Sequence, residues 1–151
     1  MKTVTFVPRK VAEIMGDDGS ILISIVHSDQ PLPEHQSEWY NIHTFVFDDI
    51  TSYVSGMILF DVDMASEITR IVKNTDKNIV VHCEAGMSRS AAIAKWIYDN
   101  GGYNLYLHPS GVGTIKHYNK FVYSVMDASV GNDMAAYYRE MELNAFINPD
   151  D

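Results

Sequence analysis

One short segment of the sequence combines residue types that could bind and attack a phosphate group. Residues 79–90 read IVVHCEAGMSRS, an apolar run followed by small residues, an arginine and a serine. Arg89 could donate two parallel hydrogen bonds to an oxyanion, and Gly86 would let the backbone turn tightly. Backbone N–H groups at the start of a helix also attract anions. The segment predicts a phosphate-binding loop, here called the phosphate loop, made of Glu84, Ala85, Gly86, Met87, Ser88 and Arg89.

Cys83 precedes this loop and is the only cysteine of the chain. A free thiol has a pKa of about 8.5, which falls to roughly 3.5–7.5 at helix N-termini or beside cations. We therefore expect Cys83 to be a thiolate that attacks phosphorus. Ser90 would donate a hydrogen bond to the sulfur, and His82 would hold the loop through a hydrogen bond. The alternative interpretation of Cys83 is a buried cysteine with a structural role.

Such an attack expels an alkoxide or phenoxide, which leaves far more easily when a carboxylic acid protonates it. Asp48 and Asp49 form an adjacent acidic pair at the end of an apolar run, residues 42–47. Adjacent side chains at a strand end point in opposite directions, so we expect one of the two to face Cys83. The other would be a solvated strand terminus or the N-cap of a turn over 50–54. The residues alone leave both assignments open.

The elements that must position these residues are strands alternating with helices. Apolar, β-branched runs predict strands over 3–7, 21–26, 42–47 and 79–81. Helical spacing predicts helices over 8–15, 64–73 (with Asp63 as N-cap), 88–100, 115–127 and 133–146. This alternation predicts an α/β three-layer sandwich, with a central, mostly parallel sheet of about four to five strands flanked by helices. Ligands bind such sheets at the carboxyl ends of the strands, with the loop over 28–37 nearby.

The length, charge and composition of the chain predict a single-domain protein that does not bind nucleic acid or membranes. The 151 residues fit a single domain over 1–151, with a helical extension from about residue 131. Eleven basic against 20 acidic residues give a net charge of −9, which disfavours partners such as nucleic acid or a membrane surface. The sequence contains no run of about 18 apolar residues and no signal-peptide pattern. We therefore expect a cytoplasmic protein in a reducing compartment.

Other residues contribute less to the functional prediction. The histidines lack ligand spacing beside a carboxylate, so we expect no metal site and no cofactor. Five of them are expected to be surface or structural residues: His27, His35, His43, His108 and His117. Tyr137, Tyr138 and Met141 have helical spacing, which predicts a docking helix and a monomer or weak dimer.

The motif His82-Cys83-x-x-Gly86-x-x-Arg89-Ser90 resembles the active-site loop of the protein tyrosine phosphatase superfamily. It is most similar to the small dual-specificity-like branch, which includes compact bacterial and phage enzymes. The segment FVFDDI over 45–50 resembles the strand end that carries the general acid of this family. The segment HYNKFVY over 117–123 is similar to a helix start in the bacterial and phage members. The resemblance covers about residues 20–127 and none of the tail from 131.

The resemblance implies a dual-specificity phosphatase-like fold and a metal-independent cysteine phosphatase that works through a cysteinyl-phosphate. It aligns Asp49 with the family's general acid and Asp48 with the position just before it. The implied substrate is a phosphorylated protein or a small phosphomonoester. The phosphate loop contains no lysine, which disfavours the phosphoinositide and RNA-triphosphate substrates of some relatives.

Two other functions remain as alternatives. One is a catalytically silent module that binds phosphate or a phosphoprotein, although such modules typically lose the cysteine, the arginine or the acid. The other is sulfurtransferase or arsenate-reductase chemistry on a similar loop. Arsenate reductases usually need further thiols, and a sulfurtransferase would not need the pair Asp48 and Asp49 or the hydroxyl of Ser90.

Overall fold

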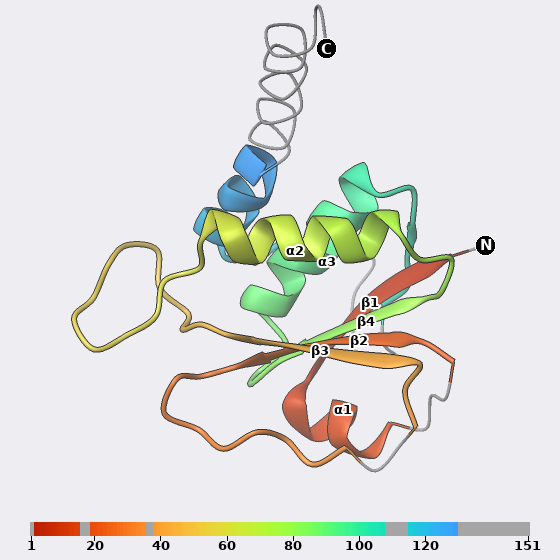
Figure 1. The fold of residues 1–151 in the computed structure, drawn as a ribbon, viewed down its shortest axis with the longest axis horizontal. Helices are drawn as coiled ribbons and strands as arrows, with labels where there is room; N and C mark the ends of the chain where they lie inside the picture. Colours follow the sequence, from red (N-terminus) through yellow and green to blue (C-terminus); the bar gives the residue numbers. More distant parts are fainter. Residues whose placement is uncertain (1, 16–18, 36–37, 108–114, 130–151) are drawn as a thin grey trace, which may run out of the picture.

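A sheet of parallel strands forms the centre of the molecule, in a computed structural model that describes residues 2–15, 19–35, 38–107 and 115–129. Its five strands have the order β3-β2-β4-β1-β5, and every pairing is parallel (Figure 1). Their bounds are β1 Thr3–Pro8, β2 Ile21–Val26, β3 Asn41–Val46, β4 Ile79–Cys83 and β5 Asn104–Leu105. Because parallel strands end at one edge, the segments that follow β2, β3 and β4 meet there.

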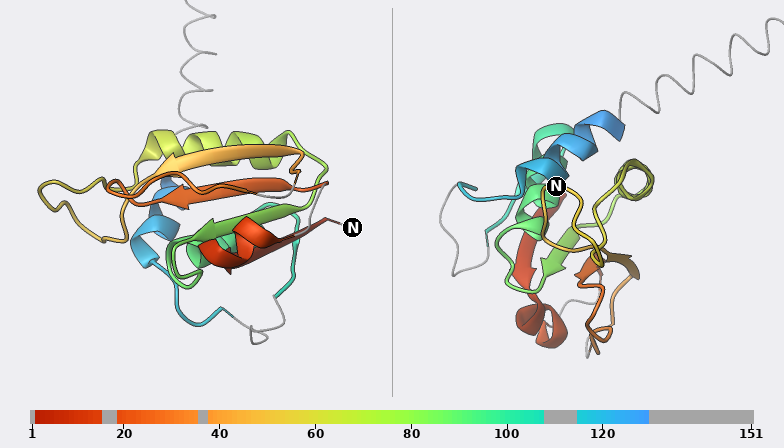
Figure 2. Two further views of the ribbon diagram at one scale, coloured as in Figure 1. Left: turned by 90° about the horizontal axis from the view of Figure 1, so that it is seen from below. Right: turned by 90° about the vertical axis from the view of Figure 1, so that its left-hand side faces the viewer.

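Helices cover both faces of this sheet. The short helix α1, Arg9–Ile14, packs on one face. The opposite face carries α2 (Val62–Lys73), α3 (Arg89–Asn100) and a helix over residues 120–129 (Figures 1 and 2). The predicted α/β architecture, a parallel sheet of four to five strands flanked by helices, is therefore confirmed.

The alternation of side chains along the central strands decides which face each functional residue reaches. In β2, Ile21, Ile23 and Ile25 belong to the large core under α2 and α3, whereas Leu22 belongs to the smaller core under α1. Each of these residues is buried, and full burial of such a side chain contributes about 1.5–3 kcal/mol. The same alternation in β4 places Cys83 in the large core, so its neighbour His82 points to the α1 face.

Two helix starts differ from the predictions by two residues or more. Helix α2 has Asp61, not Asp63, as its N-cap, because Asp61 Oδ1 accepts a hydrogen bond from Met64 N at 2.9 Å. The helix predicted over 115–127 begins only at residue 120, because Asn119 Oδ1 accepts from Val122 N at 3.0 Å. The chain over 115–119 is not helical.

Smaller differences concern the strands. β4 continues two residues beyond the predicted end and reaches Cys83, which pairs in register with Pro8. Pro8 itself ends β1, so α1 begins at Arg9. The two-residue strand β5 was not predicted. The predicted helix over 133–146, with the proposed docking residues Tyr137, Tyr138 and Met141, lies outside the described residues.

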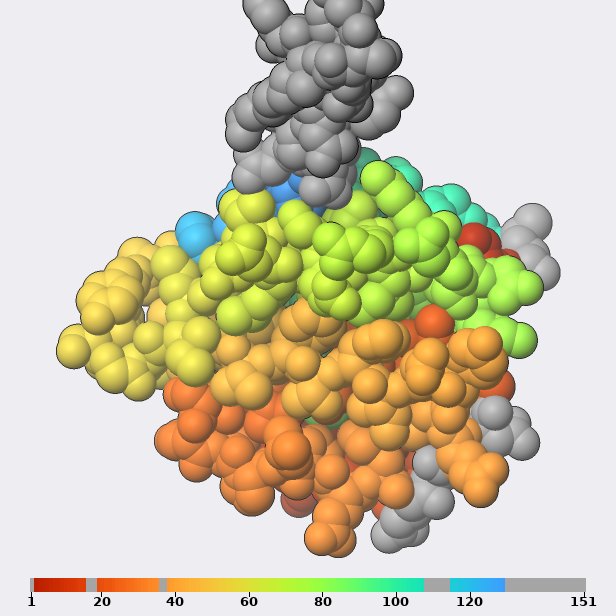
Figure 3. Space-filling view, viewed as in Figure 1, coloured from red at the N-terminus to blue at the C-terminus, as the bar shows by residue number. Residues whose placement is uncertain are grey.

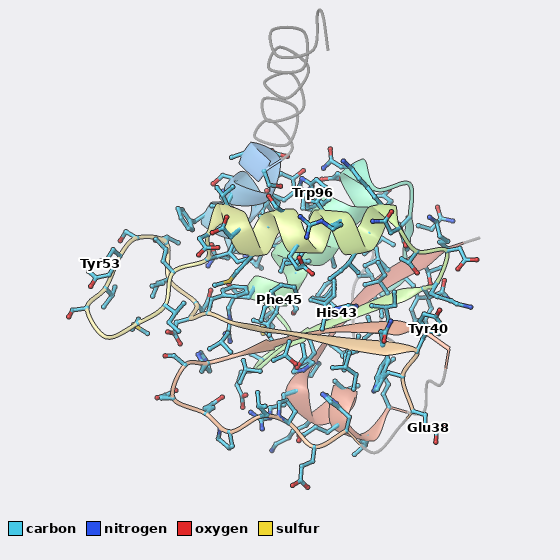
Figure 4. The ribbon with its side chains drawn as sticks, viewed as in Figure 1. Glu38, Tyr40, His43, Phe45, Tyr53 and Trp96 are labelled. Carbon is cyan, nitrogen blue, oxygen red and sulfur yellow. The ribbon has the colours of Figure 1, made fainter. Side chains whose placement is uncertain are left out.

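A loop over 49–60 projects beyond the carboxyl ends of the strands, as the space-filling view shows beside α2 (Figure 3). Tyr53 occupies its outer part and is 74% exposed (Figure 4). Two hydrogen bonds close the base of the loop, from Asp48 N to Ile58 O and from Ile58 N to Asp48 Oδ2, both 2.8 Å. None of the described helices is long and apolar enough to span a bilayer.

Candidate active site

The phosphate loop connects β4 to α3 and is packed against the end of β1. Gly86 has φ +68°, and a Cβ atom there would lie 2.3 Å from Pro8 N and 2.5 Å from the carbonyl carbon of Val7. Only glycine satisfies both the conformation and this close approach. The loop is also tied to α1, because Arg9 N donates to Glu84 O at 3.2 Å. Its exposed side chains are Glu84, Ala85 and Met87.

Cys83 is 2% exposed at the base of this loop, with its Sγ 3.1 Å from Ser90 Oγ. Burial raises the pKa of the Cys83 thiol, since it penalises the thiolate. The hydroxyl and backbone of Ser90, the charge of Arg89 and the backbone of Ser88 lower it by more. The net result is a pKa below that of an ordinary cysteine. The surroundings of Cys83 therefore favour a nucleophilic thiolate.

Arg89 is buried, and two of its three nitrogens have protein acceptors. Nη1 donates to Phe47 O at 2.9 Å, and Nη2 lies 3.2 Å from His27 Nε2. The third nitrogen, Nε, is buried and has no hydrogen-bond partner among the described residues. A buried donor without an acceptor costs about 1–3 kcal/mol, so such a group usually donates to an ordered water or a ligand. Nε and the remaining Nη hydrogens could donate to two oxygens of one oxyanion.

The structure separates the roles of the two candidate acids. Asp48 is buried and accepts hydrogen bonds from Ser28 N (3.1 Å), Ser28 Oγ (2.8 Å) and Ile58 N (2.8 Å), with His27 Nδ1 at 3.3 Å. Burial raises its pKa, but these hydrogen bonds outweigh burial and lower the pKa to about 2. The environment of Asp48 therefore holds it as a carboxylate whose oxygens are already occupied by hydrogen bonds.

Asp49 is exposed and faces the phosphate loop. Its Oδ1 accepts from Ser88 Oγ at 2.9 Å and from Asn119 Nδ2 at 2.8 Å. The two neighbouring carboxylates thus point in different directions, as expected for adjacent residues at a strand end. Only Asp49 is placed beside a residue of the phosphate loop.

His82 lies on the opposite face of the sheet from Cys83. Its Nε2 is 2.6 Å from Ser24 Oγ, its register partner on β2. Burial lowers the pKa of His82 to about 4, an effect that a backbone contact at Cys83 opposes. The neutral ring joins β2 to β4 beneath the loop, whereas we expected it to hold the loop itself.

Three groups at the site were not predicted: the imidazole of His27, the carbonyl of Phe47 and the side chain of Asn119. His27 was expected to be surface or structural. Its position directly after the carboxyl end of β2 was a usable signal, because ligands bind at that edge. Asn119 is a typical N-cap residue, but nothing in the sequence links it to Asp49.

In the part of the chain that the structure describes, no hydrogen bond joins the other histidines to Cys83, Arg89 or Asp49. His43 lies on β3, and His35 packs edge-on against His82 with ring centroids 5.6 Å apart. His108 lies outside the described residues. Within the described ranges, no three His, Cys, Asp or Glu side chains gather as a metal-binding group.

Comparisons with known proteins do not identify the chain. No family model, curated protein or solved structure matched it.

Proposed function

We propose that this chain is a metal-independent cysteine phosphatase of the protein tyrosine phosphatase superfamily, with a fold of the small dual-specificity-like type. One observation carries the proposal. The buried guanidinium of Arg89, held beside Cys83, has an Nε donor without a partner in the described part of the chain. A buried cationic donor next to a thiol of lowered pKa suits a reaction between a thiolate and a tetrahedral oxyanion.

In the first step, Cys83 Sγ attacks phosphorus, the S–P bond forms and the P–O bond to the leaving group breaks. Asp49 donates its proton to the departing oxygen, which leaves as an alcohol or phenol. Arg89 and the backbone N–H groups of residues 84–89 stabilise the equatorial oxygens, over which the charge of the transferred group is spread in the transition state. The product of this step is a cysteinyl-phosphate.

In the second step, a water molecule attacks phosphorus and transfers a proton to the Asp49 carboxylate. The S–P bond breaks, its electron pair returns to Cys83 Sγ, and inorganic phosphate is released. Ser90 Oγ, 3.1 Å from Sγ, assists by donating a hydrogen bond to the leaving thiolate. The same aspartate thus serves as acid and then as base.

The assignment of Asp49 as the acid is supported by the contrast with Asp48. Both oxygens of Asp48 are occupied by hydrogen bonds that hold the base of the 49–60 loop and lower its pKa to about 2, which makes it a poor proton donor. Asp49 is exposed and contacts Ser88 of the phosphate loop. We propose as substrate a phosphorylated protein or a small phosphomonoester, in a cytoplasmic setting.

Burst kinetics with p-nitrophenyl phosphate test this function. The wild type should release a burst of nitrophenol that matches the enzyme concentration, followed by steady turnover. Cys83→Ser should show neither, and Asp49→Asn should lose turnover of alkyl phosphates far more than of the nitrophenyl ester, whose leaving group needs no proton. Asp29→Asn, which alters an exposed carboxyl in the nearby loop, is the matched control.

Three assays on the same proteins separate the alternatives: turnover, phosphate binding, and consumption of thiosulfate or arsenate. Turnover by Cys83→Ser would contradict the mechanism. Phosphate binding by the wild type without any turnover would identify a silent binding module. Consumption of thiosulfate or arsenate in place of the phosphate ester would identify sulfurtransferase or arsenate-reductase chemistry.

A further inference from the structure

His27 lies between Asp48 and Arg89, at the end of β2. Its Nδ1 is 3.3 Å from Asp48 Oδ1, and its Nε2 is 3.2 Å from Arg89 Nη2. The side chain of Asp48 is 3% exposed and that of His27 is 26% exposed. The three side chains form a chain of polar contacts from a buried carboxylate to the guanidinium of the candidate site.

The donors and acceptors of these groups assign the protons on His27. A guanidinium only donates hydrogen bonds, so His27 Nε2 must accept and cannot carry a hydrogen. The ring proton then resides on Nδ1, which donates to the Asp48 carboxylate. Asp48 is itself fixed by two donors from Ser28 and one from Ile58, so its orientation does not depend on His27. The buried carboxylate selects the one tautomer that can accept from Arg89.

A second hydrogen bond also holds the guanidinium of Arg89. Nη1 donates to the carbonyl of Phe47, a fully buried residue whose ring packs on Phe60 with centroids 4.6 Å apart. Phe47 N in turn donates to Val26 O at 3.1 Å, which ties this carbonyl to the end of β2. The two acceptors for Arg89 therefore come from the ends of adjacent, hydrogen-bonded strands.

We propose that His27 is a positioning residue that holds Arg89 for oxyanion binding. By accepting from Nη2, it fixes the plane of the guanidinium while Nε–H stays available for the ligand. The inference rests on the proposed function, because it assigns to Arg89 the binding of the phosphoryl oxygens. His27 itself touches neither substrate nor nucleophile in this scheme.

Matched substitutions can separate the acceptor role from the bulk of the ring. In His27→Gln, the amide oxygen can occupy the place of Nε2 and accept from Arg89. In His27→Asn, the shorter amide can replace Nδ1 and donate to Asp48, but it does not reach Arg89. His27→Phe keeps an aromatic ring of similar size without either nitrogen, and it serves as a second test where the Asn variant fails to fold.

The experiment measures inorganic phosphate binding by calorimetry on the full chain, together with kcat and KM for p-nitrophenyl phosphate. We expect His27→Asn and His27→Phe to weaken phosphate binding by about tenfold, in line with the loss of one charge-assisted hydrogen bond. In the same two variants, the KM for p-nitrophenyl phosphate should rise together with the dissociation constant for phosphate. His27→Gln should stay within about threefold of the wild type, and thermal unfolding should show that each variant is folded.

Two results would overturn the inference while leaving the proposed function intact. One is wild-type phosphate affinity in His27→Asn and His27→Phe. The other is an equal loss in folded His27→Gln and His27→Asn, which would assign the effect to ring packing. A wild type that neither binds phosphate nor hydrolyses the ester would instead overturn the proposed function and, with it, this inference.

Discussion

Asn119 Nδ2 donates a hydrogen bond to Asp49 Oδ1 at 2.8 Å, although the two residues are 70 positions apart in the sequence. The backbone N–H of Asn119 donates to Ser88 O at 3.0 Å, and its Oδ1 accepts from Val122 N at 3.0 Å. One buried residue, through its side chain and its backbone N–H, therefore joins the candidate acid, the phosphate loop and the start of the helix over 120–129. Asp49 is positioned by that helix as much as by its own loop.

We predict that Asn119→Ser lowers kcat for alkyl phosphates while changing the free energy of unfolding only slightly. Serine keeps the N-cap, so the free energy of unfolding should change by less than about 1 kcal/mol, whereas loss of the cap in Asn119→Ala costs about 0.5–2 kcal/mol. Both variants lose the donor to Asp49, and both should lower kcat for alkyl phosphates by about tenfold or more. Steady-state kinetics and urea unfolding of the two variants check this. Unchanged kcat in both would show that Asn119 only caps the helix.

Ser90 should control the ionisation of Cys83. Its hydroxyl and backbone are the main causes that lower the pKa of the thiol against the effect of burial. In Ser90→Ala the hydroxyl is lost, so the pKa should rise and the thiolate should form at higher pH. Cys83 is the only cysteine, so the ultraviolet absorbance of the thiolate, taken as the difference from Cys83→Ser, follows this titration. Coincident curves for the wild type and Ser90→Ala would contradict the prediction.

Asp48 should make the folded state sensitive to acid. Its pKa is lowered from 3.8 to about 2, so its contribution to stability is complete above pH 4 and is lost as the pH falls towards 2. A shift of this size corresponds to about 2 kcal/mol. We expect Asp48→Asn to be less stable at neutral pH, with a difference from the wild type that shrinks below pH 4. Thermal unfolding between pH 2 and pH 7 measures this difference in stability, with Asp29→Asn as the control at an exposed carboxyl.

Gly86→Ala should damage the fold and the site together. The added Cβ would lie 2.3 Å from Pro8 N, and the residue would also be held at a positive φ. Gly102 has a similar φ of +76° but nothing within 4 Å of an added Cβ. Gly102→Ala should therefore cost only the conformational strain, about 1–2 kcal/mol, and leave phosphate binding unchanged. Denaturant unfolding measures the free energy of unfolding of both variants. An equal decrease in Gly86→Ala and Gly102→Ala would show that the contact with β1 is unimportant.

The local parts of the fold and site could be predicted from the sequence. The strand over 21–26 is an apolar run with Ser24 as its single polar residue, and it is buried along its whole length. The phosphate loop was predicted as one segment because its residues are contiguous. By contrast, β5 has only two residues, Asn104 and Leu105, and it exists because it pairs with β1. A strand that short leaves no periodic pattern to detect.

The long-range parts of the site could not be predicted. The sequence indicated that Asp48 and Asp49 point apart, but their distinct environments depend on donors from Ser28 and Ile58 on one side and Asn119 on the other. The role of His27 likewise depends on Arg89, 62 positions away. These pairings follow from the strand order, which no pattern within a single segment determines.

The place of β1 in the sheet has a consequence for how the chain reaches its native state. β1 lies between β4 and β5, so among the described residues β1 has no pairing partner until residues 79–83 are synthesised. Loop closure over such separations is slow, and an apolar strand that waits for its neighbours is exposed to misassembly. We expect the pairing of β1 with β4, which also seats Gly86 against Pro8, to be a late event in folding. The phosphate loop would then reach its final geometry only when β1 pairs with β4.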